Sequence, residues 1–238
     1  MSSNAVSGKR CVVLLSGGLD SATVLYFAKK KGFSPVCLIF DYGQRHRREI
    51  ESARKIARFA GCPYKIIKIS LPWQGSSLLD KKICLPQNLR DKGSGVRGRE
   101  GILVIPNTYV PARNIIFLSF ALSFAEATGA RTIFIGANAV DYSGYPDCRP
   151  EFYRAFKKVI SRGTKAGVEK TKIRIITPLI SLTKARIIKL GVKLGTPYEL
   201  TWSCYRGKRK PCGKCESCFY RAKGFKEAGV IDPALGAK

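Results

Sequence analysis

Residues 11–25 read CVVLLSGGLDSATVL, and this segment decides how the rest of the chain is interpreted. A short apolar run precedes the glycine pair Gly17 and Gly18, and a helical pattern follows it. A turn between a strand and a helix binds phosphate well, because backbone N–H groups converge there and the helix dipole is positive. The segment therefore predicts an anion-binding loop between the first strand and the first helix of an α/β fold.

The loop differs from the familiar mononucleotide loop, in which a Lys-Ser or Lys-Thr pair reaches the phosphates. Asp20 and Ser21 stand where that pair would be. Gly17 and Gly18 allow the backbone to approach a polyphosphate, and the hydroxyls of Ser16 and Ser21 add donors. Asp20 has two interpretations, a cap at the helix N-terminus or a ligand that holds Mg²⁺ on the phosphates.

The string S-G-G-x-D-S resembles the pyrophosphatase loop of ATP-dependent adenylating enzymes, which include amidotransferase-type synthetases and tRNA-thiolating enzymes. The resemblance implies that the loop grips the departing pyrophosphate while a substrate oxygen attacks the α-phosphorus of ATP. The implied ATP-binding residues are Leu15, Ser16, Gly17, Gly18, Leu19, Asp20, Ser21, Ala22, Thr23, Val24 and Leu25.

Apolar, β-rich runs alternate with helical patterns along most of the chain. Such runs, apolar on both faces, are typical of parallel strands, and several helical patterns end at a glycine. The alternation predicts a doubly wound parallel sheet of about five strands with helices on both faces, which binds ligands at the carboxyl ends of the strands. The expected strands are 10–15, 35–40, 64–69, 131–137 and 172–177, and the expected helices are 21–31, 45–60, 112–128, 151–162 and 184–194.

The length of 238 residues favours one domain with an appendage. We expect a nucleotide-binding α/β domain over residues 1–200 and a small helical, cysteine-bearing element over residues 201–238. The polar, glycine-rich stretch QNLRDKGSGVRGREG, residues 87–101, interrupts the alternation and is expected to be a mobile insertion. An active-site lid and a disordered excursion are both open interpretations of it.

Four of the nine cysteines are clustered in CYRGKRKPCGKCESC. Thiolates at this spacing converge on one ion, and four of them complete a tetrahedral structural zinc site, Zn²⁺ being favoured over a [4Fe–4S] cluster or a redox pair. Cys11 and Cys37 fall within expected strands and are interpreted as small core residues. The metal ligands expected are Cys204, Cys212, Cys215 and Cys218.

Forty-three Lys and Arg residues against sixteen Asp and Glu residues give a formal net charge of +27. This field attracts phosphates, carboxylates and nucleic acid without selecting among them, so tRNA stays open as a further partner beside a simply solvated basic surface. The longest apolar run, residues 115–125, is short of the ~18–20 residues of a membrane-spanning helix. We therefore expect a cytoplasmic protein that does not cross a membrane.

Three further strings, DYGQRH, YVPARNIIFLS with IGANAVDYSGYPDCRPEF, and TPLISLTKARIIKLG with YELTWSCY, make the chain resemble the 7-cyano-7-deazaguanine synthase family from Cys11 to Pro233. That family makes the nitrile precursor of the tRNA nucleosides queuosine and archaeosine. The resemblance implies an ATP-dependent carbon–nitrogen ligase that converts 7-carboxy-7-deazaguanine and ammonia through an adenylated acid and an adenylated amide. It also implies one bound zinc, Mg-ATP as cosubstrate and a homodimer.

Under this resemblance Asp20, Ser16, Lys184 and Arg113 are the expected catalytic residues, the last two near the α-phosphate or the developing charge. The substrate base is expected to bind residues of NAVDYSGYPDCR, which a plain polar turn would also explain. His46 can contact ligand or be structural. No segment resembling a glutaminase is visible, so ammonia comes from solution or another protein. The expected substrate-binding residues are Asn138, Asp141, Asp147 and Arg149.

Two alternatives remain open at this point. The charge and the cysteine cluster also suit an adenylating enzyme that modifies tRNA directly on the polynucleotide. A nucleic-acid-binding module with an inactive loop is the other alternative, which the intact Ser16, Asp20 and Ser21 disfavour.

Overall fold

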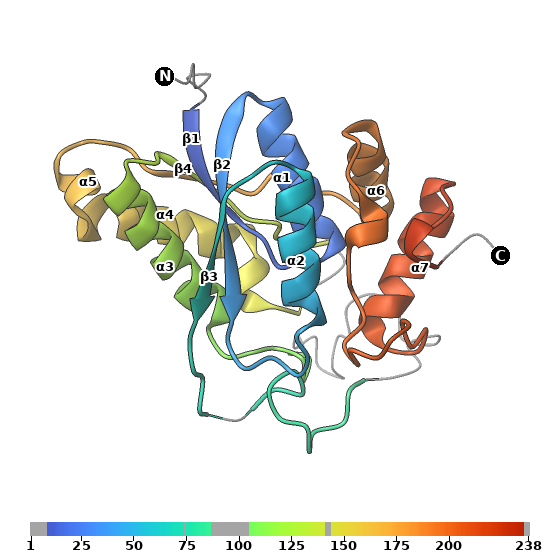
Figure 1. The fold of residues 1–238 in the computed structure, drawn as a ribbon. Coiled ribbons are helices and arrows are strands. Elements are labelled where there is room, and N and C mark those ends of the chain that lie inside the picture. The colour runs from blue at the N-terminus through green and yellow to red at the C-terminus, as the bar shows by residue number, and fades with distance from the viewer. Residues whose placement is uncertain (1–8, 74, 87–104, 141–143, 236–238) are drawn as a thin grey trace.

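Five parallel strands form one sheet at the centre of the structure, in the order β3-β2-β1-β4-β5 (Figure 1). The structure is a computed structural model that describes residues 9–73, 75–86, 105–140 and 144–235. The insertion expected at residues 87–101 lies outside the described residues. The strands are β1 (Lys9–Leu14), β2 (Phe33–Asp41), β3 (Tyr64–Lys68), β4 (Thr132–Phe134) and β5 (Arg174–Ile176).

Helices connect the strands and cover both faces of the sheet, which confirms the predicted doubly wound fold. The α-helices are α1 (Leu19–Lys30), α2 (Arg48–Phe59), α3 (Arg113–Thr128), α4 (Pro150–Gly163), α5 (Lys165–Val168), α6 (Lys184–Lys193) and α7 (Glu216–Ala228). Short 3₁₀ turns are η2 (Pro146–Cys148), η3 (Tyr198–Leu200) and η4 (Pro233–Leu235).

The boundaries differ from the sequence expectation where local contacts override the pattern. Helix α1 begins two residues early, because Gly18 has extended backbone angles and acts as the N-cap. Helix α2 begins at Arg48 and not at Arg45, because the Gln44 side chain bonds the backbone of Phe40 and Tyr42 and closes a turn before the helix. Strands β4 and β5 have three residues each and are shorter than expected.

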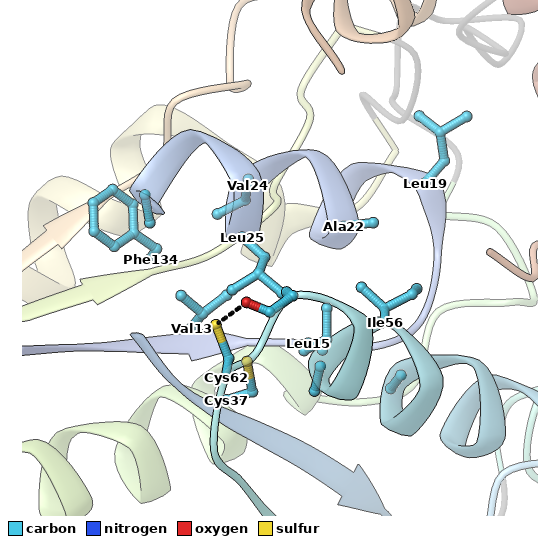
Figure 2. Packing of buried hydrophobic residues seen from close by; sticks show 14 of the residues in the cluster. Val13, Leu15, Leu19, Ala22, Val24, Leu25, Cys37, Ile56, Cys62 and Phe134 are labelled. Carbon is cyan, nitrogen blue, oxygen red and sulfur yellow. Dashed lines mark hydrogen bonds between the residues drawn. The ribbon is translucent and has the colours of Figure 1, made fainter. Parts of the chain in front are cut away.

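Two cores lie on opposite faces of the sheet. One fills the space between the sheet and the helices α1, α2 and α6, and Figure 2 shows its packing around Val13, Leu25 and Phe134. Cys11 and Cys37 are fully buried in it, which confirms the prediction that they are small core residues. The other core lies beneath α3 and α4. Burial on both faces explains why the strands are continuously apolar.

The strand order predicts where on the sheet a ligand binds. Successive strands are added in opposite directions on the two sides of the β1–β4 pair. From β1 the chain adds β2 and then β3 on one side of the sheet, and it then returns to add β4 and β5 on the other side. In open parallel sheets the crevice beyond the carboxyl ends at this reversal is where ligands bind. The loop after β1 and the segment after β4 meet at this point, where a Cβ added to Gly136 would lie 3.0 Å from the backbone nitrogen of Ser21.

The C-terminal segment packs on the same side as α1. Helix α6 contacts α1, and α7 packs on the outside of α6 (Figure 1). The close approach of α7 depends on Gly224, where a Cβ would lie 2.4 Å from Cγ of Lys184. A domain boundary near residue 200 stays a prediction. Among the described residues, no helix has both the length and the apolar character needed to cross a membrane.

Candidate functional site

The loop between β1 and α1 is held by its own serines. The hydroxyl of Ser21 accepts hydrogen bonds from the backbone N–H and the hydroxyl of Ser16, at 3.2 and 3.0 Å, and donates to the carbonyl oxygen of Gly18 at 3.1 Å. Gly17 has φ +84°, and a Cβ there would lie 2.2 Å from the carbonyl oxygen of Glu49. Both its conformation and its packing against α2 therefore require glycine. The result is a preformed, glycine-lined loop at the N-terminus of α1, which we call the cradle.

Asp20 and Lys184 form the charged pair of the site. The Lys184 Nζ donates to both carboxylate oxygens of Asp20, at 2.8 Å each. Lys184 is 6% exposed, and it begins α6 directly after Thr183, whose hydroxyl accepts from the backbone N–H of Arg186. Asp20 lies in the first turn of α1 but makes no capping hydrogen bond. The structure thus brings together two residues that are 164 positions apart in the chain.

A cavity of about 280 Å³ opens from this loop toward the carboxyl ends of β1, β2 and β4. The predicted residues that line it are Leu15, Ser16, Gly18, Leu19, Asp20, Ser21, Arg113, Asn138 and Lys184. The remaining residues predicted from the loop pack elsewhere. Ala22, Val24 and Leu25 are fully buried in the core, and the Thr23 hydroxyl bonds Leu19 and Tyr198. Their side chains anchor α1 and do not face the cavity.

Arg113 enters the cavity at the start of α3, directly after Ala112, which has the left-handed φ of 54°. This backbone conformation is uncommon for alanine, and it changes the direction of the chain immediately before α3 begins. Burial works against the charge of Arg113, but Tyr42 and Asp147 more than offset it and raise the Arg113 pKa above its ordinary value. Arg113 is therefore a permanent cation at the cavity wall.

The residues predicted to bind the substrate base are only partly brought to the cavity. Asn138 lines it and donates through Nδ2 to the carbonyl oxygen of Leu182. Asp147 is buried behind the wall, where its Oδ2 accepts from the backbone N–H of Asn114 at 3.1 Å. Arg149 caps α4 and is not part of the cavity lining, and Asp141 lies outside the described residues. Asp147 and Arg149 thus shape the wall without lining it.

Sequence reasoning missed an aromatic wall and a carboxylate. The rings of Phe40 and Phe117 are stacked with centroids 4.0 Å apart, and the ring of Tyr42 packs edge-on against Phe117 at 5.3 Å. Glu49 also lines the cavity, and burial raises the pKa of its carboxyl to about 7 against the opposing effect of Arg113. The sequence offered one signal for the aromatic wall. Phe40 and Tyr42 lie on either side of Asp41, the last residue of β2, and β2 is a neighbour of β1 in the sheet.

The four clustered cysteines come together as predicted, since their Sγ atoms all lie within 4.8 Å of one another. Backbone N–H groups point at two of the sulfurs: those of Arg206 and Cys212 at Cys204, and that of Cys215 at Cys212. Tetrahedral bonds of ~2.3 Å place ligand sulfurs ~3.8 Å apart, and donated N–H groups stabilise thiolates. The donor set and its spacing therefore fit a metal ion.

The cysteine site adjoins the cavity through Trp202 and His46. The Trp202 indole N–H donates to the carbonyl oxygen of Cys204 at 2.8 Å, and the Arg48 guanidinium lies 4.7 Å above its ring. His46 packs edge-on against Trp202 and contacts Gly207, and its Nδ1 is buried without a hydrogen-bond partner in the described part of the chain. Burial lowers the His46 pKa, so the imidazole is neutral near pH 7.

The fold and the site define an α/β protein with a phosphate-type loop at its topological switch point and a four-cysteine metal-type site beside it. The family model described as queuosine biosynthesis protein QueC matches residues 10–229. The chain therefore belongs to the QueC family.

Curated relatives support this assignment over nearly their whole length. A 7-cyano-7-deazaguanine synthase of Thermoplasma volcanium is 53% identical over 97% of this chain and 92% of the relative. The protein of the same name from Acetivibrio thermocellus is 53% identical over 94% of this chain and 96% of the relative. That of an Anaeromyxobacter species is 50% identical over 95% and 96%. These identities confirm the resemblance found in the sequence.

Proposed function

We propose that this chain is an ATP-dependent 7-cyano-7-deazaguanine synthase that joins ammonia to 7-carboxy-7-deazaguanine. One observation supports it above the others: the Asp20–Lys184 pair and Arg113 face a single cavity, so a nucleotide and an anionic substrate meet there. The relatives' names supply the identity of the substrate. The family relationship disfavours an enzyme that acts directly on polynucleotide tRNA.

The geometry suggests how ATP is held. Backbone N–H groups of residues 16–21 and the hydroxyls of Ser16 and Ser21 bind the β- and γ-phosphates, which leave as pyrophosphate. Asp20 offers carboxylate oxygens to the Mg²⁺ that accompanies ATP, and Lys184 holds that carboxylate in place. Charge that develops on the α-phosphate is then stabilised inside a partly closed cavity.

The other half of the cavity suits a planar heterocycle with a carboxylate. The Phe40–Phe117 stack and Tyr42 offer an apolar wall, and Asn138 offers an amide at its edge. Arg113 is the cation that orients the substrate carboxylate toward the α-phosphorus. We therefore place the base against the aromatic wall, with Asp147 acting behind it by fixing the start of α3 through Asn114.

The deciding experiment incubates purified protein with Mg-ATP, ammonium and 7-carboxy-7-deazaguanine, followed by mass analysis of base and nucleotide. Formation of the nitrile with AMP is expected. Nitrile with ADP would keep the function but overturn the role of the loop. ATP cleavage that depends on tRNA while the base is left intact would favour the polynucleotide-modifying enzyme.

We also propose Zn²⁺ as the ion of the four-cysteine site, with a structural role, because all four thiolates are used and no open coordination position remains. Metal analysis of the purified protein is expected to give one zinc per chain. A brown protein with iron and sulfide would instead indicate an iron–sulfur cluster. Cytoplasmic location and a homodimer belong to the same proposal, and light scattering tests the latter.

A further inference from the structure

Two acidic side chains, Asp20 and Glu49, line the cavity among the described residues. Asp20 is held on both oxygens by Lys184. The Glu49 carboxylate, in contrast, has no hydrogen bond or ion pair with any residue that the structure describes. Glu49 is half-buried, and a carboxylate that loses part of its hydration without gaining a partner is destabilised, so its presence in the cavity needs an explanation.

The position of Glu49 is fixed by the loop itself. Glu49 lies in the first turn of α2, and its carbonyl oxygen packs against Gly17, so its side chain starts beside the phosphate cradle. Three groups interact with Glu49 electrostatically: Arg113 of α3, Tyr42 directly after β2, and Cys204 in the C-terminal segment. Glu49 thus lies beside the loop, lines the same cavity as Arg113 and interacts with it electrostatically, and the proposed function brings the activated carboxyl carbon into this cavity.

We propose that Glu49 binds the ammonium ion that supplies the new nitrogen and accepts its proton before attack. This inference rests on the proposed function. Ammonium has no lone pair for nucleophilic attack, and a carboxylate both attracts the cation and takes the proton. Asp20 is less suited to this role, because Lys184 already offsets its charge and the proposed function assigns its remaining lone pairs to Mg²⁺.

The proton and bond changes balance. Ammonium gives one proton to the Glu49 carboxylate and becomes ammonia, whose lone pair forms the C–N bond at the acyl carbon. The C–O bond to the α-phosphate breaks, AMP leaves with that electron pair, and the ammonium-type nitrogen of the adduct loses its second proton to water. Glu49 returns its proton to solvent, which leaves the primary amide ready for the second activation.

The test separates activation of the acid from transfer of nitrogen. Glu49→Gln is compared with wild type and with Glu51→Gln, since Glu51 is an exposed acid in the same helical turn. Exchange of labelled pyrophosphate into ATP, driven by 7-carboxy-7-deazaguanine without ammonium, reports activation. Nitrile formation with ammonium reports transfer, and formation of the hydroxamate reports transfer to hydroxylamine, which is already neutral at pH 7.

We expect Glu49→Gln to keep pyrophosphate exchange and hydroxamate formation but to lose nitrile formation by about 100-fold or more, the usual range for a proton acceptor. Glu51→Gln is expected to match wild type in all three assays. Loss of exchange in Glu49→Gln would show a role in Mg²⁺ or substrate binding and overturn the inference. Equal losses with ammonium and hydroxylamine, or retained nitrile formation, would also overturn it. Wild-type protein inactive in every assay would count against the proposed function itself.

Discussion

The backbone N–H of Trp202 donates a hydrogen bond of 2.9 Å to the carbonyl oxygen of Gly17. Trp202 begins the cysteine-bearing segment, and Gly17 is the loop glycine at which a Cβ would lie 2.2 Å from the carbonyl oxygen of Glu49. Since the Trp202 indole also bonds Cys204, the same residue joins the metal-type site to the nucleotide loop. Trp202 therefore links the backbone of the cysteine cluster to the loop that lines the cavity.

Replacement of Cys215 by serine should release the metal and loosen the cradle together. Cys215 is fully buried and N-terminal to α7, so its loss leaves three ligands and an unsupported segment. We expect lower metal content, a lower melting temperature and weaker ATP binding, measured by metal analysis, calorimetry and titration. Cys84→Ser is the control, because Cys84 is exposed and remote in sequence. Full metal occupancy in Cys215→Ser would contradict the four-cysteine site.

Replacement of Asp20 by asparagine should abolish turnover and also reduce stability. The substitution removes the ion pair between Asp20 and the buried Lys184, and breaking such a pair costs roughly 3–5 kcal/mol when it is fully buried. The side chain of Asp20 is 22% exposed, so we expect a smaller loss. The double variant Asp20→Asn/Lys184→Met is expected to recover stability in urea unfolding but not activity. Unchanged turnover in Asp20→Asn would refute the role of the pair.

Gly17→Ala should be far more damaging than Gly32→Ala. Both glycines have left-handed φ, which costs an alanine about 1–2 kcal/mol. Only at Gly17 would the new Cβ also meet backbone atoms of Glu49 and Ala53, at 2.2 and 2.7 Å, whereas nothing lies within 4 Å at Gly32. The difference between the two variants in urea unfolding therefore measures the steric contact. Equal losses of unfolding free energy in the two variants would show that α2 moves away from the new Cβ without cost.

The pair formed by Arg221 and Asp232 should contribute strongly to stability. Arg221 donates to both carboxylate oxygens, at 2.6 and 2.8 Å, and the two side chains are 8% and 4% exposed. Arg221→Met should lose about 3–5 kcal/mol, because Asp232 stays buried and charged. Arg154→Ala, which breaks an exposed pair with Glu151, should cost less than about 1 kcal/mol. Comparable unfolding free energies for both variants would contradict this ranking.

Glu49 should also give the stability a recognisable pH dependence. Because burial raises its pKa to about 7, the native state keeps this proton at a pH where the unfolded chain has lost it. Ionisation of Glu49 thus costs native stability as pH rises through about 4.5 to 7. Glu49→Gln removes that cost, so its melting temperature should exceed that of wild type near pH 8 and equal it below about pH 4.5. The opposite sign would show that the carboxylate is stabilised when charged.

The sequence by itself determined the alternation of strands and helices, the glycine-containing turn between β1 and α1, and the convergence of four cysteines. Each of these features follows from residues that are close together in the sequence. Apolar runs predict the strands, the glycine pair follows directly after one of those runs, and the cysteines are separated by short gaps. The expected strands and the buried Cys11 and Cys37 were correct for this reason. The α2 boundary moved because the Gln44 side chain closes a turn, the α1 boundary moved because Gly18 is an extended N-cap, and β4 and β5 are shorter than expected.

Only the tertiary structure decided which polar residues share the cavity. The sequence predicted that Asp147 and Arg149 bind substrate together with Asn138, because the three are close in the chain. In the structure Asp147 lies in a 3₁₀ turn and Arg149 at the start of α4, and neither lines the cavity. Glu49 and Phe117 had no local signal, and Phe40 had only its position at the carboxyl end of β2. They meet the loop because parallel strands collect their carboxyl ends at one edge, and the strand order that decides which ends are neighbours arises from long-range pairing and not from local pattern.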